Sequence, residues 1–138
     1  QPVVSKEPSR PADETAMEAL LQLEEEKLWQ KGQYKIFHSR LTDILRVYME
    51  QRFQFGAMEL ITDEIIQQLQ NKGVADEIIK TIRSILQTAD LVKFAKMQPL
   101  AGENEECMQA ARSFVQRTTL QSLKQETNNT QQPMINQE

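Results

Sequence analysis

The stretch QYKIFHSRLTDILRVYMEQRF, residues 33–53, decides the fold class of this chain. One set of residues recurs at intervals of three and four positions: Tyr34, Phe37, Leu41, Ile44, Leu45, Tyr48 and Arg52. This spacing is typical of an amphipathic helix, because an α-helix completes one turn in about 3.6 residues. The other side is polar and carries Ser39, Arg40, Asp43, Arg46 and Glu50, of which the last three can form ion pairs at helical spacing. We therefore expect a central helix with one buried face.

A second amphipathic pattern precedes this helix, over about residues 13–31. Its apolar stripe is predicted to contain Met17, Leu20, Leu21 and Leu28, widened by Ala16 and Leu23. Asp13 can cap the free backbone amides, and Gly32 is a natural end of the helix. Consecutive glutamates point in different directions around a helix, so we expect Glu24, Glu25 and Glu26 on a solvated face rather than in a metal or partner site.

The residues after this central helix predict a bend and then a short helix. Gly56 permits the bend, because glycine adopts backbone conformations that other residues resist. Three apolar residues around it are expected in the core: Phe55, Met58 and Leu60. Thr62 is the predicted cap of the short helix, which ends at residues 71–73. Its predicted anchors are Ile65, Ile66 and Leu69.

A fourth helix is predicted to begin at residue 75 or 76. Its buried face is expected to consist of Ile78, Ile82, Ile85, Leu86 and Ala89. At Asp90 the phase of the pattern changes, and Leu91 and Phe94 fall on a different side of the helix. This change predicts either a kink or a segment that is covered on two sides. Asp90 itself is expected to be a cap or a hydrogen-bonded structural acid.

The last predicted helix spans about residues 103–123. Its apolar face is expected to contain Cys107, Ala111, Phe114, Val115 and Thr118. We interpret Cys107 as a small core residue rather than a nucleophile, because no histidine stands near it in the sequence.

These patterns predict an all-α fold. No proline interrupts residues 12–98, and the alternating runs that mark strands are missing. We expect a compact bundle of four to five helices, with a short helix after the central one and disordered termini. The predicted division is a flexible linker at 1–11, a helical domain at 12–123 and a disordered tail at 124–138.

Composition restricts the function. The net charge of −4 argues against binding of a phosphate backbone, which needs a basic face, so we expect no nucleic acid as a partner. One histidine and one cysteine leave no cluster of the kind that a zinc site needs, so no metal or cofactor is expected. The sequence contains no apolar run of the roughly 20 residues that a membrane span requires.

Two alternative functions compete with a binding role. An enzyme would need a pocket built from Asp90, His38 and Arg46, whose proximity the sequence cannot establish. We expect no enzyme, and the sequence assigns no catalytic, cofactor-binding or metal-binding residue. A DNA-binding regulator would use residues 60–90 as a helix-turn-helix. However, the second helix of that unit begins with Asp76 and Glu77, which would bring negative charge to DNA.

The order of the motifs resembles a known family. The motifs are ALLQL at 19–23, LTDILRVYMEQRF at 41–53, TDEII at 62–66, ADLVKFAK at 89–96 and ARSFV at 111–115. This order is similar to that of the C-terminal cytoplasmic region of Bacteroidetes membrane proteins of the BatD, or aerotolerance-operon, type. The resemblance covers about residues 12–118, and ADLVKFAK is its most specific part.

The resemblance implies a location and a set of partners. It implies a β-rich extracytoplasmic region, one membrane span, and this helical domain at the cytoplasmic face of the inner membrane. The proline-punctuated residues 1–11 would then link the span to the domain. MoxR-type ATPases and von Willebrand factor A-like membrane proteins are the implied partners. We therefore expect a non-enzymatic interaction or coupling domain, in which Trp29 either anchors a partner or packs under a neighbouring loop.

Overall fold

The computed structural model describes residues 10–119, and every regular element in this range is helical. The α-helices are α1 (Ala12–Glu25), α2 (Tyr34–Phe53), α3 (Thr62–Asn71), α4 (Asp76–Ala95) and α5 (Ala101–Arg117). Two 3-10 turns, η2 (Trp29–Lys31) and η3 (Ala57–Glu59), lie in the connections. The predicted all-α bundle, with a short helix after the central one, is confirmed. The expected disordered termini fall mostly on residues 1–9 and 120–138, which lie outside the described range.

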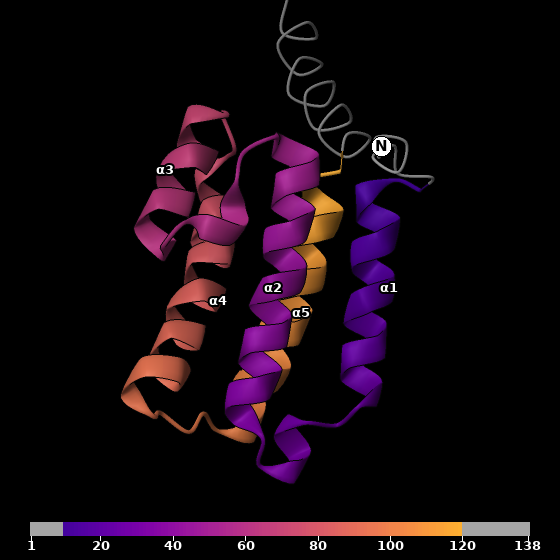
Figure 1. The fold of residues 1–138 in the computed structure, drawn as a ribbon, viewed down its shortest axis with the longest axis vertical. Helices are drawn as coiled ribbons and strands as arrows, with labels where there is room; N and C mark the ends of the chain where they lie inside the picture. Colours follow the sequence, from indigo (N-terminus) through magenta and orange to yellow (C-terminus); the bar gives the residue numbers. More distant parts are fainter. Residues whose placement is uncertain (1–9, 120–138) are drawn as a thin grey trace, which may run out of the picture.

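The bundle is organised around α2. This helix packs against α1, α4 and α5, whereas α3 packs against α4. In Figure 1, α1 and α4 flank α2, and α5 crosses behind it. The start of α1 and the ends of α2 and α5 all lie at the upper end of the view in Figure 1. The predicted central position of the 33–53 helix is therefore confirmed.

The first helix ends earlier than the sequence predicts. It stops at Glu25, and Lys27 follows with a positive φ of 54°. The chain then makes η2 and turns at Gly32, whose φ is 82°. Asp13 lies in the first turn and makes no capping hydrogen bond, so the predicted cap was wrong. Its carboxylate still lies at the helix end that favours negative charge.

The buried stripe of α1 differs from the predicted one. Leu20 and Leu23 are fully buried, but Leu21 is 51% exposed, contrary to the prediction. A stripe through Leu21 and Leu28 requires one continuous helix across both residues. The buried residues of α1 are Ala16, Leu20 and Leu23, and Leu21 lies about 100° around the helix from Leu20, on the outer side. Leu28 reaches the core from the turn that follows α1.

Charged side chains of α2 form hydrogen bonds with the backbone of the loop between α2 and α3. The Arg46 guanidinium donates hydrogen bonds to the carbonyls of Ala57, at 2.8 Å, and Leu60, at 2.6 Å. The Glu50 carboxylate accepts one from the Met58 amide at 2.9 Å. The predicted pairing of Asp43, Arg46 and Glu50 was wrong, since the loop groups take up two of these side chains.

The same loop buries a residue that the sequence did not single out. Ala57 is fully buried, whereas Met58 is 43% exposed and therefore lies outside the predicted core. Phe55 and Leu60 are half-buried and pack against the core, as predicted.

The helix pair α3–α4 follows the predicted faces closely. The predicted anchors of α3 and the predicted buried face of α4 are all buried: Ile65, Ile66, Leu69, Ile78, Ile82, Ile85, Leu86 and Ala89. Thr62 is the first residue of α3 rather than its cap, and its hydroxyl donates to the Asp90 carboxylate at 2.7 Å. Asp90 is thus a hydrogen-bonded structural acid, as expected.

The phase change after Asp90 has a different cause from those expected. Helix α4 continues to Ala95, and Leu91 and Phe94 are exposed to solvent. Helix α3 has 10 residues and α4 has 20, so α3 is too short to cover all of α4. Figure 1 shows the lower part of α4 extending beyond α3. The segment was therefore wrongly expected to be covered on a second side.

The last helix begins and ends earlier than predicted. It runs from Ala101 to Arg117, and the Glu103 carboxylate accepts a hydrogen bond from the Leu100 amide at 2.8 Å. The predicted buried face of α5 is confirmed: Cys107, Ala111, Phe114, Val115 and Thr118. The predicted continuation from 120 to 123 lies outside the described residues.

Candidate functional site

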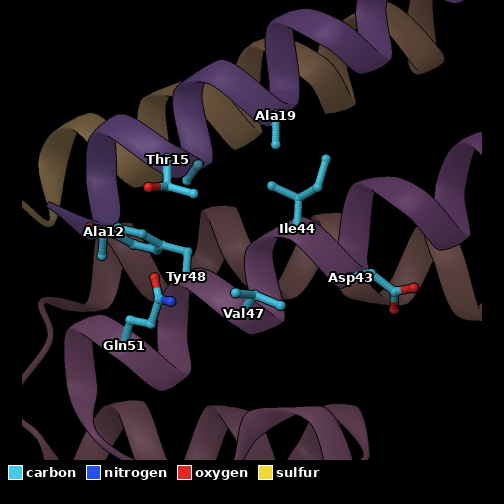
Figure 2. Close-up of a pocket in the computed structure, with 9 residues that line it drawn as sticks. Ala12, Thr15, Ala19, Asp43, Ile44, Val47, Tyr48 and Gln51 are labelled. Atoms are coloured by element: carbon cyan, nitrogen blue, oxygen red, sulfur yellow. The ribbon is translucent and has the colours of Figure 1, made fainter. Parts of the chain in front are cut away.

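An apolar groove separates the first half of α1 from the second half of α2 (Figure 2). We call it the α1/α2 groove, and its volume is about 220 Å³. Its lining consists of Ala12, Thr15, Ala16, Ala19, Asp43, Ile44, Val47, Tyr48 and Gln51. The α1 wall is made of small side chains, so α1 leaves space that leucines would fill. Asp43 carries the only charge in this lining, and Figure 2 shows it at the opposite end from Ala12 and Gln51.

A second cleft adjoins the groove where the start of α1 meets the end of α2. It shares Ala12, Tyr48 and Gln51 with the groove, and it is also lined by Thr119. The last described residue therefore lies at the mouth of the α1/α2 groove. Neighbouring contacts fix this end of α5. The Arg52 Nε donates to the Thr118 carbonyl at 2.5 Å, and the Tyr48 and Thr118 hydroxyls lie 2.7 Å apart.

The end of α4 carries two exposed apolar side chains. We call Leu91 and Phe94 the α4 apolar pair; they are 48% and 79% exposed. The Lys93 ammonium lies 5.7 Å from the centre of the Phe94 ring, and the exposed Lys96 ends the helix with a φ of 58°. Contiguous exposed apolar patches mark interaction sites, and aromatic side chains are typical anchors at the centre of an interface.

The three residues considered for catalysis have separate partners. His38 Nε2 lies 2.8 Å from Asn104 Oδ1, Asp90 bonds Thr62, and Arg46 bonds loop carbonyls. His38 and Arg46 are eight positions apart on α2, a rise of about 12 Å along the helix. The structure therefore gives these groups individual structural contacts and does not assemble them into one pocket.

The contact between His38 and Asn104 is fully buried between α2 and α5. His38 Nδ1 has no hydrogen-bond partner among the described residues. Burial lowers the pKa of His38, and the hydrogen bond with Asn104 opposes this effect. The neutral imidazole is the form that this environment favours, because a buried imidazolium would carry an N–H without an acceptor.

Cys107 lies in a cleft between α4 and α5 and is almost fully buried. Burial is the main cause that raises its pKa to about 11, and the carboxylates of Glu103 and Glu106 also raise it. A thiol with a raised pKa is a poor nucleophile at neutral pH, since the thiolate is the reactive form. This environment suits the predicted role as a core residue.

Trp29 and the consecutive glutamates Glu24, Glu25 and Glu26 lie around the end of α1, where several side chains contact other helices. Trp29 is half-buried and packs against the core, which agrees with the packing interpretation. Glu24 forms an ion pair with Arg112 of α5, and Glu26 accepts two hydrogen bonds from Arg40 of α2. The glutamates point in different directions, as expected. The expected solvated face was wrong for Glu24 and Glu26, since each contacts another helix.

Known proteins give no further assignment for this chain. No family model, curated protein or solved structure matches the chain. Within residues 10–119, no three His, Cys, Asp or Glu side chains come together in a way that could hold a metal ion. Over the same range, no helix combines the length and the apolar character needed to cross a membrane. The resemblance to BatD-type proteins stays a prediction.

The sequence contained a signal for the groove that pattern reasoning missed. Ala12, Ala16 and Ala19 recur at intervals of four and three, so they form a stripe of small residues on α1. The sequence pattern predicts Ala16 on the apolar stripe of the first helix but does not single out Ala12 or Ala19. The buried Asn104 carried no such signal, because its partner His38 is 66 positions away.

Proposed function

We propose that this chain is a non-enzymatic interaction domain that couples a membrane-anchored parent protein to a protein partner. The observation that carries the proposal is the α4 apolar pair, Leu91 and Phe94, which lies uncovered among the described residues beside Lys93 and Lys96. Aromatic side chains at the centre of an interface supply much of its binding energy. The partner we propose presents an apolar pocket surrounded by acidic side chains, because it must accept Phe94 between two lysines.

The resemblance supplies candidate partners. In BatD-type proteins the corresponding region faces the cytoplasm, and MoxR-type ATPases and von Willebrand factor A-like membrane proteins are encoded nearby. The part of the sequence that carries this resemblance best, residues 89–96, is also the segment that holds the α4 apolar pair. We therefore propose that the domain lies at the cytoplasmic face of the inner membrane and that one of these proteins is the partner.

The surroundings of α4 favour a protein partner over DNA. Asp76 and Glu77 are exposed at the start of this helix, where a recognition helix would approach the bases. The Glu77 carboxylate lies 3.6 Å from the Arg117 guanidinium, so it also neutralises a nearby cation. A shift of random-sequence duplex DNA by the domain at low salt would overturn this preference.

The proposal is tested by direct binding to the purified cytoplasmic parts of the two candidate partners. Phe94→Asp places a charge at the proposed interface, and binding should weaken at least about tenfold, as expected for loss of a central aromatic anchor. Leu21→Asp is the matched control, because Leu21 is 51% exposed on α1 and lies outside the proposed surface.

The control variant should bind like the unmodified chain, and binding should weaken as salt is raised, because the lysines contribute. Equal binding by both variants would remove the α4 apolar pair from the interface. Failure of the unmodified chain to bind either protein would overturn the proposed partners. A Trp29→Ala variant that lost binding would move the interface to the lower end of the bundle.

A further inference from the structure

The α1/α2 groove has two ends with different properties. At the mouth, near Ala12 and Gln51, it opens into the cleft that contains Thr119. At the far end lies Asp43, an exposed carboxylate that makes no ion pair with any residue in the range 10–119. An occupant that matches this groove needs an aliphatic side chain for its middle and a cation for its far end.

The middle of the groove has an apolar lining that matches a branched aliphatic side chain. Ile44 is half-buried and Val47 is 40% exposed, and both face the small side chains of α1 across the hollow (Figure 2). A leucine placed there would contact Ala16, Ala19 and the two α2 side chains. Such contacts remove apolar surface from water on both sides of the groove.

The residues that follow Thr119 have the required order of side chains. Residues 120–124 read LQSLK, so Leu123 is followed at once by Lys124. Gln51 and Asp43 are eight positions apart on α2, a rise of about 12 Å. Five extended residues span about 16 Å, which leaves length for the change of direction that the chain needs after α5. The length of residues 120–124, the order of Leu123 and Lys124, and the charge of Lys124 therefore match the α1/α2 groove.

We propose that residues 120–124 of this chain occupy the α1/α2 groove, with Leu123 against Ile44 and Val47 and with Lys124 paired to Asp43. The segment is held at its start, because Thr118 is bonded by Arg52 and Tyr48. A tethered segment competes at a high effective concentration, so it keeps other aliphatic peptides out of the groove. This assignment is independent of the proposed function, which uses the opposite side of the molecule at α4.

The experiment compares methyl NMR spectra of the full chain and its variants, with Ile44 and Val47 as reporters. In the full chain we expect nuclear Overhauser contacts between the Leu123 methyl groups and these two side chains. Leu123→Asp should abolish the contacts and shift the reporter signals. Met134→Asp is the matched control, since Met134 lies in the same terminal segment but outside residues 120–124, and it should leave the reporters unchanged.

Charge exchange tests the far end of the groove. Asp43→Lys and Lys124→Glu should each reduce the Leu123 contacts, and the double variant should restore them. Methyl signals of Ile79 and Ile82, which are buried in α4, report that each variant is folded. The proposal is overturned if Leu123→Asp leaves the reporters unchanged, or if the double variant fails to restore the contacts. Reporter shifts that grow with protein concentration would also overturn it, because they would assign the groove to a second copy.

Discussion

The two sides of α2 are built in different ways. Toward α5 it packs with large and specific groups: Phe114 lies edge-on to Tyr48 with ring centres 6.0 Å apart, and His38 bonds Asn104. Toward the first half of α1 it meets alanines and leaves the α1/α2 groove. The first side specifies how the helices pack, and the second leaves room for another segment. The two sides of α2 thus differ because α5 presents large side chains to one side and α1 presents alanines to the other.

The largest expected contrast comes from truncating one residue on each side. Phe114→Ala should lower the free energy of unfolding by about 3–5 kcal/mol, because Phe114 is fully buried and its removal leaves a cavity. Ile44→Ala on the groove side should cost less than about 2 kcal/mol, since its surroundings are already hollow. Urea unfolding followed by circular dichroism measures both. Equal costs would contradict the distinction between the two sides.

The buried imidazole on the α5 side predicts a pH dependence. The pKa of His38 is lowered in the folded chain, so the unfolded chain binds more protons as the pH falls below about 6.5. The stabilising effect is complete above that pH and declines as the pH falls toward the folded pKa, with a slope of at most about 1.4 kcal/mol per pH unit. Urea unfolding between pH 7.5 and 5.5 should show this loss, and His38→Gln should remove the part due to His38. An unchanged pH profile in that variant would contradict the assignment.

A smaller loss of stability is expected at Tyr48, which lies between the α5 side and the groove side of α2. The Tyr48 ring lines the groove, while its hydroxyl contacts Thr118 Oγ1 and donates to the Val115 carbonyl at 3.3 Å. Tyr48→Phe keeps the ring and should lower the free energy of unfolding by about 1 kcal/mol. Thermal unfolding checks the value. A neutral result would mean that the hydroxyl contacts do not stabilise the end of α5.

The smallest expected effect is an increase in the free energy of unfolding. Ala19→Leu adds apolar surface to the groove and should raise the free energy of unfolding by about 0.5 kcal/mol in a chain that ends after Thr119. In the full chain the same substitution should give no gain, because the added side chain competes with Leu123. Urea unfolding of both chains measures the difference. A loss above about 1 kcal/mol in the shorter chain would show that the groove has no room for a larger side chain.

The sequence predicted the buried faces of long helices well, because periodicity reports burial directly. Ile78, Ile82 and Ile85 were placed correctly on α4 for this reason. The prediction from periodicity failed where a turn interrupted the helix. The turn at Lys27 ended α1 early, so Leu28 does not lie on the stripe of α1 that the sequence predicted. No propensity rule predicts a positive φ at a lysine.

The candidate site was less predictable than the fold. Leu91 and Phe94 were recognised as out of phase, but their exposure depends on which neighbouring helices cover that side of α4. Pairs such as Glu24 with Arg112 join residues that are 88 positions apart, and one sequence does not reveal such contacts. Long-range partners and hollow surfaces depend on how the helices are placed together. That information appears only in the assembled bundle.

The proposed role as an interaction domain is tested most directly by site-specific photo-crosslinking in living cells. A photoreactive amino acid replaces Phe94 in one sample of the protein and Leu21 in the other. Position 94 should form a defined adduct with one protein, at an apolar pocket that is flanked by acidic residues, and position 21 should not. No adduct at position 94, or the same adducts from both positions, would contradict the assignment of α4 as the docking surface.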